Sequence, residues 1–537
     1  MTSLNLVPQL ELRHPGFALG IAGGLGQATV HAMLGLTVGF AAARVMRSFH
    51  LRWSWAAAAL LFSVLTARSL VGGLTSALGL STLSATVLGR RWHEQDLSLG
   101  ADLAAAAAAR LGPVDLLRSG AARVALRRRR GSADGWFQRE ELMLGCDERC
   151  RPVSIPCGGD GGGTHTLVVG STGSGKTVTQ AWIAVRAIEH GMGVVVLDPK
   201  GDRGLRDAVR DAAGAAAGEF VEWTPGGPSV YNPYARGSET QIADKILAGE
   251  RFTEPHYLRQ AQRYMGHVVR ALRHSGLEVS LRRIVDHLNP AELELLARGL
   301  PEQEGRRTHA YLDSLTGRQQ ADLAGVRDRL AILAESDIGA WLDPQGGGSE
   351  SFDLLAAVLR RQVTYFNLES DSRPLLAQML GAAIVQDLQA TVAELQRRPV
   401  PTLLVIDEFS AIAAEQVVRL FGRARSAGFS LLLGTQELSD LRLPGRHSLQ
   451  EQVMGNLSTL IAHRQVVPQS AELVARLAGG TGAWRASQRD DGSWSRTRTR
   501  VGVLEPDEVM RLGRGWAAVI ALAAGGGARI ARVFAPE

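Results

Sequence analysis

The sequence predicts an α/β protein: a doubly wound, mainly parallel sheet with an inserted all-helical domain and transmembrane helices at its N-terminus. Three observations lead to this class. Short apolar runs alternate with helical segments from about residue 140 to the end. Amphipathic helical patterns without strands fill the stretch 236–350. The stretch 17–43 is apolar and longer than the roughly 20 residues needed to cross a bilayer.

The first 90 residues are predicted to be a membrane anchor. Only Gln27, His31 and a few hydroxyl residues interrupt the stretch 17–43, and a second span is expected at 53–73. Small residues recur every four positions, as membrane helices in close contact require. They are Gly16, Gly20, Gly24, Ala28 and Ala32, and then Gly35, Gly39 and Ala43. Two spans are preferred, although the arginines between them favour one or three spans by the positive-inside rule.

Residues 91–139 are predicted to be a basic juxtamembrane linker. They contain the run Arg127 to Arg130, which fits either contact with anionic lipid or a solvated charge cluster. The whole chain carries a net charge of +6. Its three cysteines lie close together, but their spacing matches no common zinc pattern, so we interpret them as structural or incidental. They are Cys146, Cys150 and Cys157.

A phosphate-binding loop follows an apolar run at 167–169 and precedes a helical run at 178–190. The segment fits the pattern GxxxxGK[ST], in which backbone N–H groups surround phosphate oxygens, the lysine neutralises the β- and γ-phosphates, and the hydroxyl binds Mg²⁺. Its residues are Gly170, Ser171, Thr172, Gly173, Ser174, Gly175, Lys176 and Thr177. The segment therefore predicts a site for ATP or GTP with Mg²⁺.

Two acids follow a second apolar run at 402–406. Such a run is typical of a buried parallel strand, and its end marks the edge of the sheet where nucleotides bind. Asp407 is the candidate for holding the Mg²⁺ water shell, and Glu408 for orienting the attacking water as the base. Further strands are expected at 193–198, 362–368, 430–434, 459–464 and 516–523. The core, assigned to 140–235 and 351–537, is that of a RecA-like P-loop NTPase.

Six segments stand out along the chain: HTLVVGSTGSGKT (165–177), VVVLDPKGD (194–202), YNPY (231–234), LLVIDEFSAI (403–412), RARSAGFSLLLGTQELSDL (423–441) and GNLSTLIAHR (455–464). In order and spacing they resemble the type IV secretion coupling proteins, the membrane-anchored TraG/TraD-type DNA pumps of conjugation. The resemblance covers roughly residues 140–535.

The resemblance implies roles for further residues. Gln436 corresponds to a polar sensor at the end of a strand, and Arg425 to an arginine finger offered to a neighbouring subunit, with Arg423 as the other candidate. Asp198 and Lys200 match a family motif without an implied chemical role. The resemblance also implies a homo-hexamer in a bacterial inner or plasma membrane with a cytoplasmic ATPase domain. Its partners would be DNA, a relaxase and the components of a type IV secretion channel.

These features predict a membrane-anchored ATPase ring that translocates DNA in conjugative transfer. DNA binding enters through the resemblance, since no helix-turn-helix, zinc-finger or OB-fold signature is recognisable. Two alternatives stay open: a chromosomal DNA translocase of the FtsK/HerA type, and a nucleotide-gated membrane receptor that docks protein substrates to a secretion channel. A hairpin expected at 484–503 around Asp491-Gly492 carries alternating arginines, which fit DNA contact or simple exposure.

Overall fold

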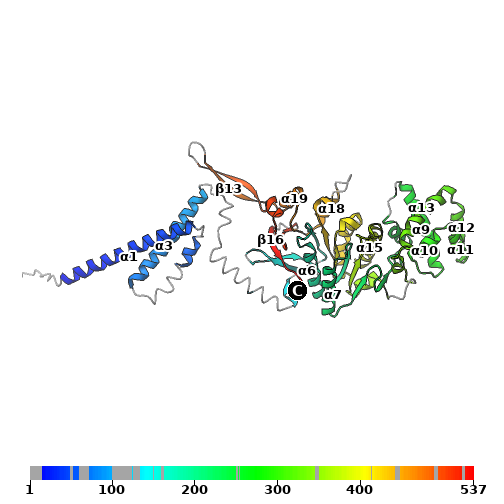
Figure 1. Ribbon diagram of the computed structural model, residues 1–537, viewed down its shortest axis with the longest axis horizontal. Helices are drawn as coiled ribbons and strands as arrows, with labels where there is room; N and C mark the ends of the chain where they lie inside the picture. Colours follow the sequence, from blue (N-terminus) through cyan, green and yellow to red (C-terminus); the bar gives the residue numbers. More distant parts are fainter. Residues whose placement is uncertain are drawn as a thin grey trace, which may run out of the picture. The chain divides into compact units, whose positions relative to one another are not determined.

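A computed structural model describes residues 15–48, 53–59, 72–98, 124 and 133–536. Short gaps lie at 139, 149, 159–161, 250–251, 253, 345–349, 413, 442–447, 489–493 and 523–526. The chain forms two compact units (Figure 1). One comprises residues 1–124 with 481–501, and the other 125–480 with 502–537.

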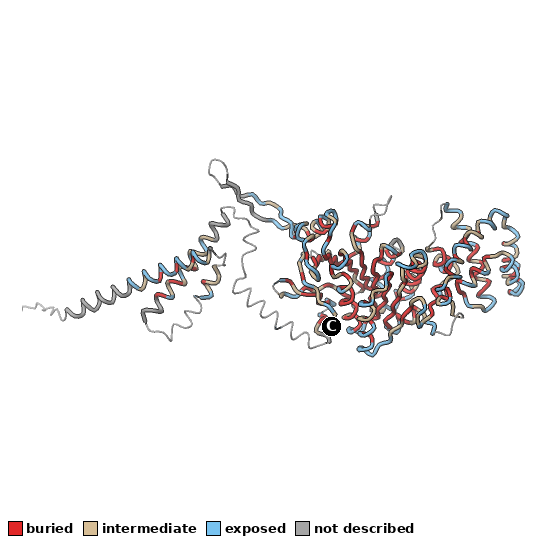
Figure 2. The backbone as a smooth tube through the Cα atoms, in the orientation of Figure 1, coloured by how far each residue is buried: buried red, intermediate tan, exposed pale blue. Residues whose placement is uncertain are grey.

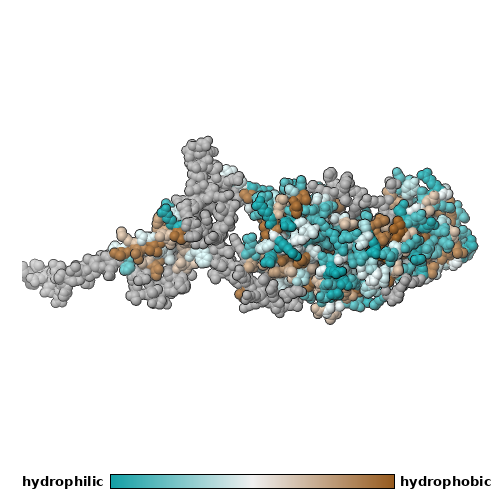
Figure 3. Space-filling view, in the orientation of Figure 1, coloured by the Kyte–Doolittle hydropathy of each residue, from teal (hydrophilic) through white to brown (hydrophobic). Residues whose placement is uncertain are grey.

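In the first unit, helix α1 (Pro15–Ser48) packs against helix α3 (Gly72–Ser98). A Cβ added to Gly35 would lie 2.7 Å from the carbonyl oxygen of Ala77, and one added to Gly39 would collide with α3 at Ser84. The second half of the predicted small-residue pattern therefore lets the two helices approach closely. The described part of these helices carries an apolar surface (Figure 3).

Among the described residues, two helical stretches are long and apolar enough to cross a bilayer. Thr29–Met46 lies within α1. The other is α15 (Pro374–Leu395), which is mostly buried in the second unit and is a core helix there. Most of the second predicted span, 53–73, lies outside the described residues. The helix paired with α1 instead includes residues 91–98, which the sequence analysis placed in the linker.

The second unit is built on a mixed sheet in the order β1-β2-β16-β15-β12-β4-β11-β10-β5-β9-β6, with β3 paired to β2. The seven strands from β12 to β6 are parallel, and those from β15 to β1 pair antiparallel. The parallel strands are β4 (His165–Val169), β5 (Gly193–Asp198), β6 (Phe220–Trp223), β9 (Val363–Asn367), β10 (Thr402–Ile406), β11 (Phe429–Thr435) and β12 (Thr459–Ala462). The others are β1 (Phe137–Gln138), β2 (Glu141–Cys146), β3 (Pro152–Pro156), β15 (Trp516–Ala521) and β16 (Ala528–Val533).

The predicted α/β class with a mainly parallel sheet is confirmed. Each strand expected from an apolar run is present, although β15 pairs antiparallel with its neighbours. The short strands at 137–156 were missed by sequence reasoning. The predicted hairpin is present as β13 (Gly480–Gln488) paired with β14 (Trp494–Gly502), while Asp491 and Gly492 lie outside the described residues.

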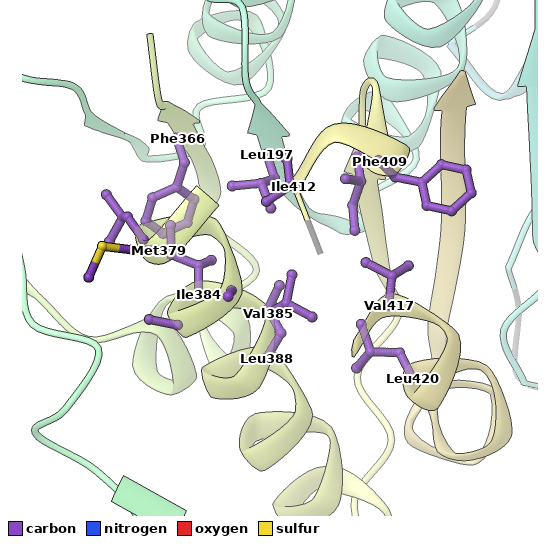
Figure 4. Close-up of a cluster of buried hydrophobic side chains, with 14 of the residues drawn as sticks. Leu197, Phe366, Met379, Ile384, Val385, Leu388, Phe409, Ile412, Val417 and Leu420 are labelled. Atoms are coloured by element: carbon purple, nitrogen blue, oxygen red, sulfur yellow. The ribbon is translucent and has the colours of Figure 1, made fainter. Parts of the chain in front are cut away.

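Helices cover both faces of the parallel strands, so these strands are buried on both sides (Figure 2). On one face lie α6 (Lys176–Glu189) and α7 (Arg203–Ala215). The other face packs against α15 and neighbouring helices, with Phe366, Ile384 and Leu420 among the buried contacts (Figure 4). The helices beside α15 on that face are α14 (Leu354–Leu359), α16 (Phe409–Ile412), α17 (Ala414–Ala424), α18 (Ser448–Asn456), α19 (Pro468–Ala478) and α20 (Pro506–Met510).

Where it is described, the stretch predicted as an inserted domain, 236–350, consists of helices and the turns that connect them, apart from the first residue of β8. Ser238 and Thr316 form capping boxes that start two of these helices. The short strands β7 (Ser229–Tyr231) and β8 (Glu350–Phe352) pair in parallel at its two ends. Its helices are α8 (Glu239–Leu247), α9 (Pro255–His274), α10 (Leu281–His287), α11 (Pro290–Ala297), α12 (Glu302–Asp313) and α13 (Gly317–Ala334).

The YNPY segment joins these helices to the core. The hydroxyl of Tyr231 donates to Asp387 Oδ2 on α15 at 2.6 Å, and Lys245 Nζ donates to Asp387 Oδ1 at 2.5 Å. Asn232 Nδ2 donates to the carbonyl oxygen of Val279 at 2.8 Å. All of these polar groups are buried and mutually satisfied. The motif therefore fixes the start of the helical insertion on a core helix.

Replacement of Asp387 by alanine is expected to destabilise the second unit by about 3–5 kcal/mol, because it leaves the buried Lys245 ammonium without its charge partner. Chemical denaturation followed by tryptophan fluorescence measures this loss. Asp507→Ala removes an exposed ion-paired carboxylate and is the control, with an expected loss of about 0–1 kcal/mol. Equal losses in the two variants would contradict the role assigned to the buried cluster.

Candidate nucleotide-binding site

The phosphate-binding loop connects β4 to α6, and its shape depends on two glycines. Gly173 and Gly175 have φ angles of 77° and 115°, which other residues adopt only with strain. The loop is held from outside: Ser171 N–H donates to the carbonyl oxygen of Arg464 at 3.1 Å, and Gly515 N–H donates to that of Ser174 at 2.9 Å. Free backbone N–H groups at the start of α6 are thus placed for an anion.

Lys176 contacts both predicted acids. Its Nζ lies 2.6 Å from Asp407 Oδ1 and 2.7 Å from Glu408 Oε1, and all three side chains are at least nine-tenths buried. Strand β11 runs between β4 and β10, so the loop and the acids meet at the same carboxyl edge of the sheet. Burial disfavours the ammonium, but the two carboxylates outweigh it and raise the pKa of Lys176. The lysine is therefore charged and available to phosphate.

A turn in the backbone brings two successive acids to one lysine. Side chains that follow each other along a strand point to opposite faces. Glu408 leaves the strand with a φ of 44°, in the left-handed region, and this turns its carboxylate to the same side as that of Asp407. Such a conformation is uncommon for a residue other than glycine and is often found at functional sites.

The carboxylate of Glu408 has further polar neighbours. Lys200 Nζ lies 3.4 Å from Glu408 Oε1, and the Gln436 side chain donates a hydrogen bond to the same carboxylate. Burial would raise the pKa of Glu408, but Lys176, Lys200 and Gln436 together lower it below its usual range. Glu408 is consequently deprotonated at neutral pH, which is the state that a base needs.

Asp198 shapes the loop that carries Lys200. Its carboxylate accepts hydrogen bonds from the backbone N–H groups of Lys200, Gly201 and Asp202, at 2.9, 2.9 and 2.6 Å. The Tyr365 hydroxyl donates to the same carboxylate at 2.5 Å. The DPKGD segment thus folds around a buried acid and directs Lys200 toward Glu408.

A cleft of about 400 Å³ lies over these groups. It brings together most of the predicted residues, while Ser174 is buried beneath the loop and Asp198 lies behind the 200–202 loop. Its lining residues are Gly170, Ser171, Thr172, Gly173, Gly175, Lys176, Thr177, Val178, Lys200, Gly201, Asp202, Asp407, Glu408, Gln436 and Arg514. The glycine-lined loop, the lysine, the hydroxyl and the carboxylates fit a nucleoside triphosphate with Mg²⁺.

Two family models match this part of the chain. The model described as "Helicase HerA, central domain" matches residues 163–311, and the model described as "TraM recognition site of TraD and TraG" matches residues 401–514. These two matches make the chain similar to the type IV coupling proteins of the FtsK/HerA superfamily. It is a P-loop ATPase.

Solved structures and one curated relative are similar to this chain. The bacterial conjugative coupling protein TrwBdeltaN70 has 15% identity and a TM-score of 0.56, with 75% of this chain and 92% of that one covered. TrwB with a non-hydrolysable ATP analogue has 16% identity and a TM-score of 0.54, again with 75% of this chain and 92% of that one covered. An uncharacterized protein of Mycoplasma pneumoniae is 33% identical over 104 residues, which are 19% of this chain and 69% of that protein.

The two arginine-finger candidates of the chain lie away from its own cleft. Arg423 lies in the last turn of α17, and Arg425 begins the short 3₁₀ helix η3 (Arg425–Ala427) before β11. The backbone of Arg425 accepts a hydrogen bond from Gly163 N–H before β4, at the amino edge of the sheet. Its guanidinium is exposed and donates to the carbonyl oxygen of Asn456 at 2.7 Å. Neither arginine can serve the site of its own chain.

Sequence reasoning missed three residues of the site: Arg514, His463 and Gln180. Arg514 lines the cleft from a loop that no motif marked. His463 lies under the phosphate-binding loop, where its Nδ1 donates to the Trp516 carbonyl oxygen at 3.0 Å and its Nε2 accepts from Thr179 Oγ1 at 2.8 Å. Burial lowers the pKa of His463 to about 4, so the ring is neutral. The segment GNLSTLIAHR contained His463, but only its contacts reveal its place.

Proposed function

We propose that this coupling protein is an ATP-driven motor that translocates DNA during conjugative transfer. The observation that carries the proposal is the convergence of Lys176, Asp407, Glu408 and Gln436 at one cleft of a coupling-protein core. ATP and Mg²⁺ are the cofactors, in agreement with TrwB structures that hold an ATP analogue or ADP with Mg²⁺.

The residues that converge at the cleft have distinct roles in hydrolysis. Lys176 and the N–H groups of residues 173–177 bind the phosphates, while Thr177 and Asp407 would hold Mg²⁺, which neutralises developing charge. Glu408 orients the attacking water and accepts its proton, and Gln436 holds the Glu408 carboxylate in place. Lys200 keeps Glu408 deprotonated until the water is bound.

The proposal includes a ring in a bacterial membrane. Helix α1 supplies an apolar stretch long enough for an anchor, and its small-residue face packs on α3. Because Arg425 lies at the amino edge of the sheet, it completes a cleft only when a neighbouring subunit presents it. We propose a homo-hexamer with its ATPase domain in the cytoplasm, and a relaxase and secretion-channel components as partners. The proposed domains are 1–90, 91–139, 140–235 with 351–537, and 236–350.

The ATPase rate of the full-length protein in nanodiscs, with and without single- and double-stranded DNA, tests this function. Strong stimulation by DNA is expected, with a steep dependence on protein concentration. The Lys176→Ala variant controls for contaminating ATPases. Turnover that no DNA stimulates would favour the docking receptor over the motor.

Removal of the Lys200 charge is expected to move the acid limb of the pH–rate profile to higher pH. Lys200 helps to lower the pKa of Glu408, so in Lys200→Met the carboxylate stays protonated up to a higher pH and the base is lost there. Turnover at saturating MgATP between about pH 5 and 8 measures the limb. Arg203→Met removes an exposed charge at the start of α7, next to that loop, and should leave the acid limb in place. If the acid limb of Lys200→Met lay at the same pH as in the wild type, Lys200 would not be lowering the pKa of Glu408.

A further inference from the structure

Gln180 is a buried amide without a partner beside the catalytic acids. It lies on α6 four residues after Lys176, and therefore on the same face of the helix. The residue is fully buried, and neither its Nε2 nor its Oε1 has a hydrogen-bond partner among the described residues. Buried side-chain amides are nearly always hydrogen-bonded, so an unpaired one calls for an explanation.

Gly434 places this amide next to Asp407. Gly434 lies near the end of β11, between the ends of β4 and β10. A Cβ added there would lie 2.5 Å from Asp407 Oδ1 and would also collide with Gln180 Nε2. The amide nitrogen and the carboxylate oxygen thus border the same small space, which only glycine leaves open.

The Asp407 carboxylate depends on Lys176 for a hydrogen-bond donor. Among the described residues, Lys176 is the only side chain that donates a hydrogen bond to the Asp407 carboxylate. A bound triphosphate would attract the ammonium of Lys176 toward the phosphates. The Asp407 carboxylate would then lose its donor at the moment when it has to hold the Mg²⁺ water shell.

We propose that Gln180 is a positioning residue that replaces Lys176 as the hydrogen-bond donor to the Asp407 carboxylate when nucleotide binds. Its Nε2–H group donates to Oδ1, and the carboxylate keeps its direction toward the magnesium site. The inference rests on the proposed ATPase function and adds one residue to it. Glu408 needs no such replacement, because Lys200 and Gln436 already contact its carboxylate.

Binding of a fluorescent ATP analogue to the full-length protein, with magnesium and with excess EDTA, tests the proposal. Gln180→Leu should weaken binding with magnesium about tenfold, the effect of one hydrogen bond to a charged group, and leave binding in EDTA unchanged. In the Asp407→Ala background, Gln180→Leu should add no further loss, because the two residues act as a pair. Thr364→Val is the control, since it removes another buried, unpartnered polar atom, on β9.

The outcomes separate this inference from the proposed function. A wild-type protein without magnesium-dependent binding would refute the ATPase site itself. If the wild type binds normally, any of three results would overturn the role of Gln180. These results are unchanged binding by Gln180→Leu, equal losses of binding with magnesium and with EDTA, and a further loss when Gln180→Leu is added to Asp407→Ala. If Gln180→Leu does not fold, Gln180→Met, which keeps the length of the side chain, is judged by the same criteria.

Discussion

Replacement of Glu408 by glutamine is expected to lower the hydrolysis rate by about 10²–10⁴-fold while ATP still binds. Glutamine keeps the size of the side chain but cannot accept a proton from water. Lys176, Thr177 and Asp407 remain, so the phosphate and magnesium sites are intact. The variant should therefore hold uncleaved ATP. Single-turnover phosphate release, measured beside equilibrium nucleotide binding, separates the two effects.

Two further variants serve as comparisons for Glu408→Gln. Lys176→Ala removes the cation that faces the phosphates and should lose binding as well as hydrolysis. Glu189→Gln changes an exposed acid at the far end of α6, away from the cleft, which is paired with the mostly buried Arg186, and should retain the wild-type rate. If Glu408→Gln released phosphate within about tenfold of the wild-type rate, the base would be another group, because a general base contributes at least about 10²-fold.

Much of the fold followed from local pattern. The runs at 194–197 and 403–406 are apolar throughout because both faces of these strands are covered by helices. The phosphate-binding loop was recognisable because its glycines occupy φ values that leave little choice of residue. The antiparallel pairing of β15 was not predictable, since a buried antiparallel strand inside a mixed sheet has the same apolar composition as a parallel strand.

The site was predictable only where one motif carried both the residue and its role. Asp407 and Glu408 end a strand beside a recognised loop, and their contact with Lys176 follows from that topology. Gln180 and His463 act through side chains from distant segments, and no local pattern marks such contacts. The YNPY segment was noticed as a motif, but its buried link to Lys245 and Asp387 required the fold.

Replacement of Arg425 by alanine is expected to lower the hydrolysis rate by about 10³–10⁵-fold, although the residue lies outside the cleft of its own chain. Seven residues of β11, at about 3.3 Å each, separate the edge that carries Arg425 from the edge that carries the nucleotide site. The guanidinium is exposed and, among the described residues, makes one hydrogen bond, to a carbonyl oxygen, so its loss should not affect folding. Arg423→Ala tests the other candidate at the same edge.

Mixed rings decide whether Arg425 acts on a neighbour. In an equal mixture of Glu408→Gln and Arg425→Ala subunits, a site is complete when an Arg425→Ala subunit supplies the cleft and a Glu408→Gln subunit supplies the arginine. In a head-to-tail ring this holds at about one quarter of the interfaces, so activity should rise well above that of either variant alone. A mixture no more active than its components would mean that Arg425 does not act across the interface. Normal turnover in Arg425→Ala alone would leave Arg423 as the remaining candidate.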